Sequence, residues 1–344
     1  MRVLAHVLSS GYYAGLSLHK ALYKMGILAT KNAPCKVISV GNITVGGTGK
    51  TPFTLFLANL LKEQQKRVAV IVRGYKSKDK YILISDGKNI FQDAFQAGDE
   101  GYLLAKRLQD IPVLKEKKRY IAVSYAYSRF RPDVVVLDDA FQHWALKRDL
   151  DIVLLDGEMP FNNGHLLPRG KLREPIRALA RADAIVLSKA NKSKIREGLK
   201  VYLEERFHNI PIFIADYVLE SLVSIDSTFY PLDYLKDEPV LAFCAISKPE
   251  GFRYTCRMLG VKINKFMIYP DHYYYSLDDF TFLQKKAKVS KAKFLLTTEK
   301  DAVKIRKQKT ENRKQSLPIF YPRISMQIKD KQVFYHWLRK KLGF

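Results

Sequence analysis

The sequence predicts an α/β protein with a mainly parallel sheet flanked by helices, followed by a second, smaller α/β domain. Short apolar runs typical of buried strands alternate with stretches typical of helices along most of the chain. Parallel strands need long crossovers, so this alternation favours βαβ units with covered sheet faces. The pattern loosens around residues 215–238, which separates the two parts. With 344 residues, 47% of them hydrophobic, the chain can bury a sizeable core.

The expected elements follow one another in the order of such a fold. Strands are expected at 36–40, 68–72, 81–85, 120–123, 134–137, 152–155 and 184–187, with helices after Lys50 and after Asp99. The second part is expected to hold strands at 239–246, 262–269, 293–297 and near Ile319, and helices from Pro249, from Leu277 and over 329–342. The predicted organisation is a helix at 1–28, a first domain at 29–220, a hinge at 221–238 and a smaller domain at 239–344.

The composition points to anionic partners. Lys and Arg number 59 against 34 acidic residues, a net charge of +25, which favours nucleic acid, an anionic membrane face or a phosphorylated substrate. Cys35, Cys244 and Cys256 form no CxxC pair, which argues against a disulfide framework or a zinc site and favours a reducing cytoplasm. No apolar run is long enough to span a bilayer, so any membrane contact is expected to be peripheral.

The segment 2–28 combines a loosely helical apolar pattern with interspersed basic residues. Two interpretations stay open: a helix packed on the core, or a helix that faces the membrane surface, where each basic residue near anionic lipid contributes roughly 1 kcal/mol. A secretion signal is disfavoured, because His6, Ser9 and Ser10 interrupt the apolar run and no clear cleavage site follows.

A glycine-rich turn between a strand and a helix predicts a phosphate-binding loop of the P-loop NTPase type. The segment reads Gly41-Asn-Ile-Thr-Val-Gly-Gly-Thr-Gly-Lys-Thr51. Backbone N–H groups of such a loop approach phosphate oxygens, a lysine neutralises the β- and γ-phosphates, and a Thr hydroxyl ligates Mg²⁺. The candidate ATP-binding residues are Gly46, Gly47, Thr48, Gly49, Lys50 and Thr51. The loop is a variant, because Thr44 stands where the usual spacing has glycine.

The strand at 134–137 leads into Asp138 and Asp139, which predict the second half of the nucleotide site. One of these carboxylates is expected to reach Mg²⁺, because the strand's carboxyl end meets the loop. Asp99 and Glu100 begin a helix, where capping is the default role. Residues 164–175 form a basic, proline-containing loop suited to phosphate contact, and His272 follows a strand of the second domain.

Together these motifs resemble the tetraacyldisaccharide 4'-kinase family, the lipid A 4'-kinases. The matching segments run in family order over most of the chain: 39–52, 73–75, 98–100, 137–143, 167–175, 271–272 and 298–303. The resemblance implies ATP-dependent phosphorylation of the 4'-hydroxyl of a tetraacylated glucosamine disaccharide 1-phosphate, at the cytoplasmic face of the bacterial inner membrane. A kinase needs a shielded cleft and a positioned nucleophile, so the second domain is expected to close over the first.

The resemblance also implies roles for individual residues. Asp99 is the candidate base for the sugar hydroxyl and His272 its partner, with Lys50 at the phosphates. Glu174 joins Thr51, Asp138 and Asp139 as a candidate around Mg²⁺. Arginines able to face phosphates are Arg73, Arg169 and Arg173, with Arg129 as a further candidate.

Two other functions compete with this interpretation. A partition-type, membrane-associated P-loop ATPase carries a signature lysine where this chain has Val45. A nucleic-acid-binding module would fit the charge and the 20 tyrosines, but no DNA- or RNA-reading motif accompanies them, so no nucleic-acid partner is expected. The kinase is therefore the preferred function.

Overall fold

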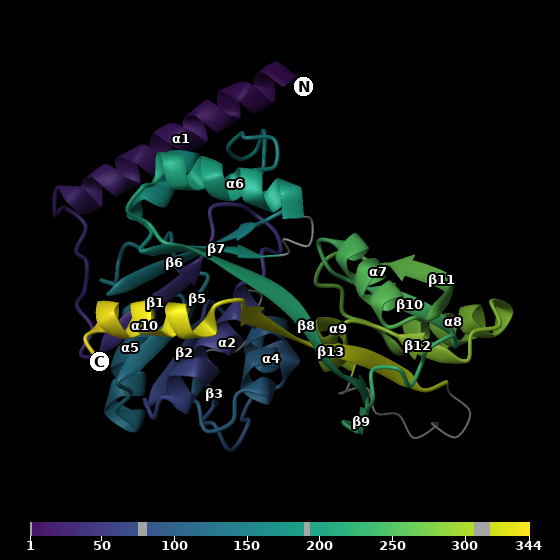
Figure 1. The fold of residues 1–344 in the computed structure, drawn as a ribbon. Coiled ribbons are helices and arrows are strands. Elements are labelled where there is room, and N and C mark those ends of the chain that lie inside the picture. Colours follow the sequence, from purple (N-terminus) through teal and green to yellow (C-terminus); the bar gives the residue numbers. More distant parts are fainter. Residues whose placement is uncertain (1, 75–80, 189–192, 306–316) are drawn as a thin grey trace. The chain divides into compact units, whose positions relative to one another are not determined.

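The computed structural model describes residues 2–74, 81–188, 193–305 and 317–344 (Figure 1). The chain divides into two compact units, which are described separately. Unit 1 comprises Met1–Phe91, Leu104–Tyr217 and Met326–Phe344, and unit 2 comprises Gln92–Leu103 and Val218–Ser325. The chain passes from one unit to the other between Phe91 and Gln92 and within α4 (Asp99–Arg107), β8 (Ile212–Ser224) and β13 (Ile319–Ile328).

Unit 1 contains a mainly parallel sheet with the strand order β8-β7-β6-β1-β5-β2-β4-β3. Its central strands are β1 (Lys36–Gly41), β2 (Val68–Val72), β5 (Val134–Asp138), β6 (Leu150–Asp156) and β7 (Ala184–Ser188). They pair in parallel and are buried almost throughout, as expected for strands covered on both faces. Toward one edge lies β4 (Val113–Lys115), and the edge strand β3 (Leu83–Ser85) pairs with it in the antiparallel sense.

The helices of unit 1 are α1 (Arg2–Lys24), α2 (Lys50–Glu63), α5 (Arg119–Phe130), α6 (Ser193–Arg206) and α10 (Lys331–Leu342), with the 3-10 turn η1 (Ile176–Arg181). The predicted P-loop-type α/β fold is confirmed by this arrangement of a parallel sheet and flanking helices. Within the described part of the chain, no helix is both long enough and apolar enough to cross a membrane.

The strands of unit 2 pair in parallel, in the order β11-β10-β12-β13. The strands are β10 (Pro239–Cys244), β11 (Lys262–Ile268), β12 (Phe294–Leu296) and the first part of β13, while β9 (Phe229–Tyr230) pairs antiparallel with the end of β8. The helices are α3 (Ala94–Ala97), α7 (Pro249–Met258), α8 (Leu277–Val289) and α9 (Glu299–Ile305).

Alternation along β10 builds two hydrophobic cores in unit 2. Leu241 and Phe243 pack with Leu283 of α8, whereas Val240 and Ala242 belong to the cluster of Phe252 in α7. Successive side chains of a strand point to opposite faces, so one strand fixes a helix on each side of the sheet.

Several elements differ from the sequence predictions. The expected strand at 120–123 is wrong, because these residues lie in α5, where Ala122, Val123 and Ala126 form one buried helical face. The loosened region after residue 215 begins as a continuous strand, since β8 runs to Ser224.

The observed units also divide the chain differently from the expected ranges 29–220 and 239–344. α10 belongs to unit 1, because the Phe334 ring lies 6.1 Å from that of Phe53 in α2 and 4.9 Å from that of Phe213 in β8. Residues 92–103 group with unit 2, where Phe95 of α3 stacks edge-on against Tyr274.

Candidate active site

The glycine-rich loop lies between β1 and α2, as predicted. Gly46 and Gly49 have φ angles of +113° and +89°, a region that L side chains rarely adopt. At Gly49, a Cβ would also lie 2.6 Å from Cε of Met326 and clash with the Tyr217 hydroxyl. Two side chains brace Thr48: Asn42 Nδ2 donates to its hydroxyl (3.0 Å) and Ser188 Oγ donates to its carbonyl (2.7 Å). The loop is therefore held in shape by the surrounding chain.

The segment 171–174 runs beside this loop and supports it through backbone hydrogen bonds. Val45 N–H donates to the Lys171 carbonyl (2.7 Å), and Arg173 N–H donates to the Ile43 carbonyl (2.7 Å). The same segment carries the Arg173 guanidinium to Asp139, with Nη1 2.8 Å and 3.0 Å from its two carboxylate oxygens. The basic loop at 164–175 thus contributes a cation to the end of β5.

The structure brings four predicted site residues together where β5 ends beside α2. Lys50 Nζ lies 3.5 Å from Asp139 Oδ1, and Thr51 Oγ1 lies 3.4 Å from Asp138 Oδ2. The other oxygen of Asp138 accepts a hydrogen bond from Thr54 (3.0 Å). These contacts join the first turn of α2 to the carboxyl end of β5.

The charges around Asp139 keep its carboxylate ionised. Burial alone would raise the pKa of Asp139, but the positive charges of Lys50 and Arg173 outweigh burial and lower the pKa below its ordinary value. Asp139 also has a φ of +54°, a left-handed conformation uncommon outside glycine and asparagine-like residues. Two cations thus share one carboxylate at this end of the strand.

Glu174 occupies a different environment from the other metal candidates. It is fully buried, and its carboxylate accepts two hydrogen bonds from Arg181 (2.9 and 3.0 Å) and one from Gln142 (3.0 Å) and pairs with Lys20 of α1. Burial would raise the pKa of Glu174, but the Arg181 hydrogen bonds lead a set of interactions that lower it. Among the described residues, the side chains that bind the Glu174 carboxylate are therefore those of Arg181, Gln142 and Lys20.

Arg119 lies beside the candidate site and was not among the residues that the sequence predicted. It is buried at the start of α5, where its Nη2 donates to the backbone carbonyl of Asp138 (2.9 Å). Burial lowers the pKa of Arg119 to about 10, against the opposing charges of Asp138 and Asp139. Arg129, the predicted candidate, is exposed and contacts Tyr125. The misassigned strand at 120–123 concealed the helix whose first residue is Arg119.

The other predicted arginines differ in their surroundings. Arg73 follows β2 and is exposed, and Arg169 is exposed with its Nη1 2.8 Å from His6 Nδ1 of α1.

In unit 2, Asp99 and His272 form the predicted pair. His272 Nδ1 lies 2.8 Å from Asp99 Oδ2, and the Asp99 side chain is 7% exposed. Burial would raise the pKa of Asp99, but the His272 hydrogen bond and nearby lysine charges lower it to about 2. The carboxylate is therefore ionised at neutral pH and orients the imidazole through Nδ1, which leaves Nε2 as the imidazole's second proton-exchanging atom.

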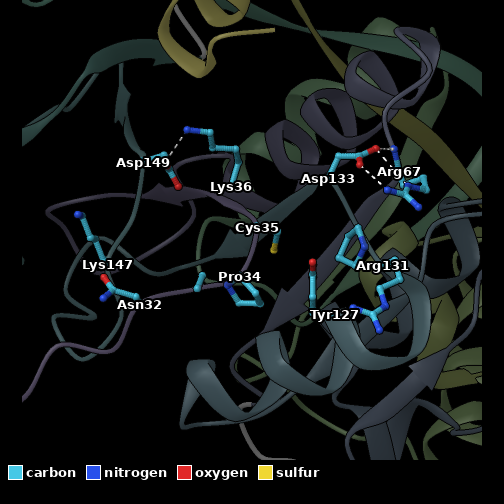
Figure 2. A pocket seen from close by; sticks show the side chains of 12 residues that line it. Asn32, Pro34, Cys35, Lys36, Arg67, Tyr127, Arg131, Asp133, Lys147 and Asp149 are labelled. Carbon is cyan, nitrogen blue, oxygen red and sulfur yellow. Dashed lines mark hydrogen bonds and ion pairs between the residues drawn. The ribbon is translucent and has the colours of Figure 1, made fainter.

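A cavity of about 850 Å³ opens at the amino ends of β1 and β5, the ends of these strands that lie opposite the glycine-rich loop (Figure 2). Its acidic residues are already paired: Asp149 with Lys36 (3.2 Å) and Asp133 with Arg67 (2.7 Å). In parallel α/β sheets, ligands bind at the carboxyl ends of the strands, where the glycine-rich loop lies. This cavity is therefore separate from the candidate active site.

The residues gathered at the loop can cradle a nucleoside triphosphate and hold oxygen donors beside it. Glycines expose backbone N–H groups, Lys50 supplies charge, and Thr51 with Asp138 supplies hard oxygen atoms. The Asp99–His272 pair offers acid–base chemistry. Within the described residues, no cluster of three or more His, Cys, Asp or Glu side chains forms a metal site by itself.

Comparisons with known proteins agree with this chemistry. A family model described as tetraacyldisaccharide-1-P 4'-kinase matches residues 1–343. Proteins called tetraacyldisaccharide 4'-kinase include one from Syntrophus aciditrophicus, which is 39% identical in an alignment that covers 97% of this chain and 91% of the relative. Another, from Aquifex aeolicus, is 38% identical over 84% of this chain and 85% of the relative. The crystal structure of the "apo" form of LpxK from Aquifex aeolicus in complex with ATP matches with a TM-score of 0.80, at 34% identity and over 99% of both chains.

Proposed function

Since the chain belongs to the tetraacyldisaccharide-1-P 4'-kinase family, we propose that it transfers the γ-phosphoryl group of ATP to the 4'-hydroxyl of a tetraacylated disaccharide 1-phosphate. Membership of this family confirms the resemblance inferred from the motifs and favours a kinase over a partition-type ATPase. The observation that carries the residue-level proposal is the meeting of Lys50 and Thr51 with Asp139 and Asp138 beside the glycine-rich loop.

The loop residues Gly46 to Thr51 hold the triphosphate in this proposal. No side chain caps the start of α2, so its backbone N–H groups could bind the phosphates, and the helix dipole favours negative charge there. Lys50 and Arg173 bind Asp139 in this structure and supply positive charge beside the transferring group when ATP is present.

The donor set beside the loop fits Mg²⁺, which prefers carboxylate and hydroxyl oxygens and keeps part of its coordination for substrate phosphates. Thr51 and Asp138 would hold the ion, with Asp139 next to them, while the carboxylate of Glu174 is bound by Arg181, Gln142 and Lys20. Bound Mg²⁺ supplies charge neutralisation on the β- and γ-phosphates. Glu174 is proposed to support the site by fixing the segment that carries Arg173.

The Asp99–His272 pair is proposed to act on the acceptor. The pair takes the proton of the 4'-hydroxyl as its oxygen bonds to the γ-phosphorus, and the bond to the β–γ bridging oxygen breaks to release ADP. The ionised Asp99 holds the imidazole through Nδ1 and balances the charge that develops as the proton is transferred.

The helix α1 is proposed to place the enzyme on the cytoplasmic face of an anionic membrane. One side of α1 packs on the rest of unit 1: Ser9 Oγ donates to the Leu166 carbonyl (3.1 Å) and the Tyr12 hydroxyl donates to that of Arg173 (2.8 Å). Exposed apolar side chains line the rest of the helix: Leu4 (64%), Val7 (62%), Leu8 (52%) and Leu18 (60%). An exposed apolar stripe beside basic residues suits a lipid surface, where the acylated substrate resides.

Phosphoryl transfer from labelled ATP to the disaccharide lipid in detergent with Mg²⁺ tests the function. The wild-type protein should label the lipid, and hydrolysis without lipid should be slower, which separates a kinase from an ATPase. Asp99→Ala and His272→Ala should each lower kcat by roughly 10²–10⁴ while the KM for ATP stays close to wild type. Lys50→Ala should lower the rate of transfer through lost charge on the phosphates. Wild-type kcat in all three variants would overturn the assigned roles.

A further inference from the structure

A lysine in α9 completes the surroundings of the Asp99–His272 pair. Lys300 Nζ lies 3.7 Å from Asp99 Oδ2 and 3.3 Å from Glu100 Oε1, and its side chain is 22% exposed. It thus faces the same carboxylate oxygen that His272 Nδ1 approaches at 2.8 Å. The other oxygen, Oδ1, accepts a hydrogen bond from the Glu100 backbone N–H (3.0 Å).

An ionised carboxylate as buried as Asp99 needs a compensating charge. A neutral imidazole donates one hydrogen bond and brings no charge, so the pair alone would leave a buried anion with no charge to offset its desolvation. Among the described residues, the other charged and titratable groups in this part of unit 2 include Glu100, Asp271, Tyr274, Asp301 and Lys304. Lys304 is engaged with Asp301, 2.7 Å away and equally buried, so within the described part of the chain Lys300 is the lysine in direct contact with Asp99.

The positions of Lys300 and His272 are both fixed by hydrogen bonds to Ala245, the residue after β10. Asp301, the residue after Lys300, accepts hydrogen bonds from the Ala245 backbone N–H (3.0 Å) and from the Thr298 hydroxyl (2.6 Å). The carbonyl of Ala245 accepts the backbone N–H of His272 (3.2 Å). The end of β10 therefore fixes both the lysine and the histidine, one through each backbone group of Ala245.

We propose that Lys300 is a positioning residue for the Asp99–His272 pair, which keeps the Asp99 carboxylate charged and turned toward His272 Nδ1. This inference rests on the proposed acid–base role of the pair. Lys300 itself remains charged: burial would lower its pKa, but Glu100 and Asp99 outweigh burial and raise the pKa. Its charge is also among the causes that lower the pKa of Asp99.

Removal of the Lys300 charge has a defined sign. A nearby cation disfavours protonation of both a carboxylate and an imidazole, so its loss raises the pKa of whichever member of the pair takes the proton. The acidic limb of the pH profile of kcat/KM should then move to higher pH. An opposite charge at this range shifts a pKa by about one unit, so we expect Lys300→Met to move the limb upward by roughly 0.5–1 pH unit.

The test is the profile of kcat/KM for the lipid acceptor between pH 5 and pH 10, at saturating ATP. Lys300→Met should show the upward shift and a kcat at pH 7 lower by roughly tenfold, with little change in the KM for ATP. Lys300→Arg, which keeps the charge, should restore the wild-type limb. Lys288→Met is the matched control, because Lys288 is an exposed lysine of α8 in the same unit and its loss changes the net charge equally.

A second variant gives a result that does not depend on the folding of Lys300→Met. Glu100→Gln removes the other acidic partner of Lys300, and Glu100 is 45% exposed, so this variant should fold. It removes a negative charge near Asp99 and should shift the acidic limb to lower pH. The role of Lys300 would be overturned if the acidic limbs of Lys300→Met and Glu100→Gln both coincided with that of wild type. It would also be overturned if the Lys300→Arg profile lay no closer to wild type than the Lys300→Met profile.

The proposed function and the role of Lys300 fail in different ways. If Asp99→Ala and His272→Ala keep wild-type kcat, the acid–base role of the pair is wrong. If both lose activity while Lys300→Met matches Lys288→Met at every pH, the pair acts and Lys300 does not position it.

Discussion

The hydroxyl of Thr51 lies 3.4 Å from the Asp138 carboxylate, so the first turn of α2 and the carboxyl end of β5 meet at one oxygen atom. The two residues lie 87 positions apart in the chain and are brought together by the parallel pairing of β1 with β5. A second threonine, Thr54, holds the other oxygen of the same carboxylate from one turn further along α2. The carboxylate is thereby positioned from one side by a single helix.

The two threonines should contribute differently to function. Thr51→Val removes a proposed Mg²⁺ ligand and should raise the Mg²⁺ concentration needed for half-maximal activity by roughly 10–100-fold. Thr54→Val removes a buried hydrogen bond and should lower the free energy of unfolding by about 1–2 kcal/mol, with a smaller change in Mg²⁺ requirement. Mg²⁺ titration of the transfer reaction and urea denaturation distinguish the two. Equal Mg²⁺ requirements in both variants would contradict the ligand role of Thr51.

Glycine is required at position 49. Gly49→Ala places a Cβ at a φ of +89° and against Tyr217 and Met326, so it should cost at least ~1–2 kcal/mol of stability and raise the KM for ATP. Gly198→Ala is the control, because Gly198 lies on the exposed side of α6 with no atom near its Cβ position. The control should increase stability by about 0.5–1 kcal/mol. Thermal melting and ATP titration provide the readouts, and a Gly49→Ala protein as stable as wild type would refute the loop geometry.

The buried ion pair of α9 should be sensitive to loss of one partner. Lys304 and Asp301 lie 2.7 Å apart with both side chains fully buried, so Lys304→Met leaves an uncompensated carboxylate and should cost roughly 3–5 kcal/mol. Lys304→Met combined with Asp301→Asn should cost less than the sum of the single variants, which a double-mutant cycle in denaturant measures. Additive costs would show that the two charges do not interact.

Thiol labelling should depend strongly on pH. Burial raises the pKa of Cys35 to about 11 and the pKa of Cys244 and of Cys256 to about 12. The thiolate is the reactive form, so at pH 8 Cys35 should react on the order of 10² times more slowly than an ordinary cysteine, whose pKa is about 8.5. Its rate should then rise about tenfold per pH unit up to pH 10. Cys35 is half-buried at the cavity of Figure 2 and should be labelled first. Rapid labelling at pH 8 in native protein, equal to that in denaturant, would disprove this order.

The apolar stripe of α1 should determine membrane binding. Replacement of Leu4, Val7, Leu8 and Leu18 by serine removes exposed apolar surface without touching Ser9 or Tyr12, the residues that attach α1 to unit 1. Flotation with vesicles containing anionic lipid should fall by about tenfold or more, since several buried side chains are lost from the interface. ATP hydrolysis or transfer to a detergent-solubilised acceptor should change little. Flotation equal to wild type would rule out this surface as the membrane contact.

Much of the fold could be predicted from the sequence, because buried parallel strands are continuous apolar runs. The runs at 36–40, 68–72, 134–137 and 184–187 all lie within strands of unit 1. The nucleotide loop could also be predicted, since its order of glycines, lysine and threonine is specific for phosphate binding. Those parts of the site that lie within one continuous segment could therefore be predicted from the sequence.

What the sequence concealed depends on contacts between distant segments. The run at 120–123 is too short to separate strand from helix by periodicity, which hid Arg119 and favoured Arg129. The carboxylate of Glu174 meets Lys20 because α1 packs beside the segment 171–174, whereas Arg181 reaches it from η1, seven residues further along the chain. The link from Asp301 through Ala245 to His272 joins three elements by backbone groups, which leave no pattern in side-chain identity.

The packing of α10 against α2 bears on how the protein is made. The aromatic ring of Phe334 rests on Phe53, three residues beyond Lys50, and α10 leaves the ribosome after every residue of unit 2. All residues of unit 2 are therefore made while unit 1 still lacks α10, a helix that covers part of its hydrophobic core. The nucleotide loop gains its full support only after α10 has been made, so premature termination before α10 should yield chains that chaperones and proteases recognise as unfinished.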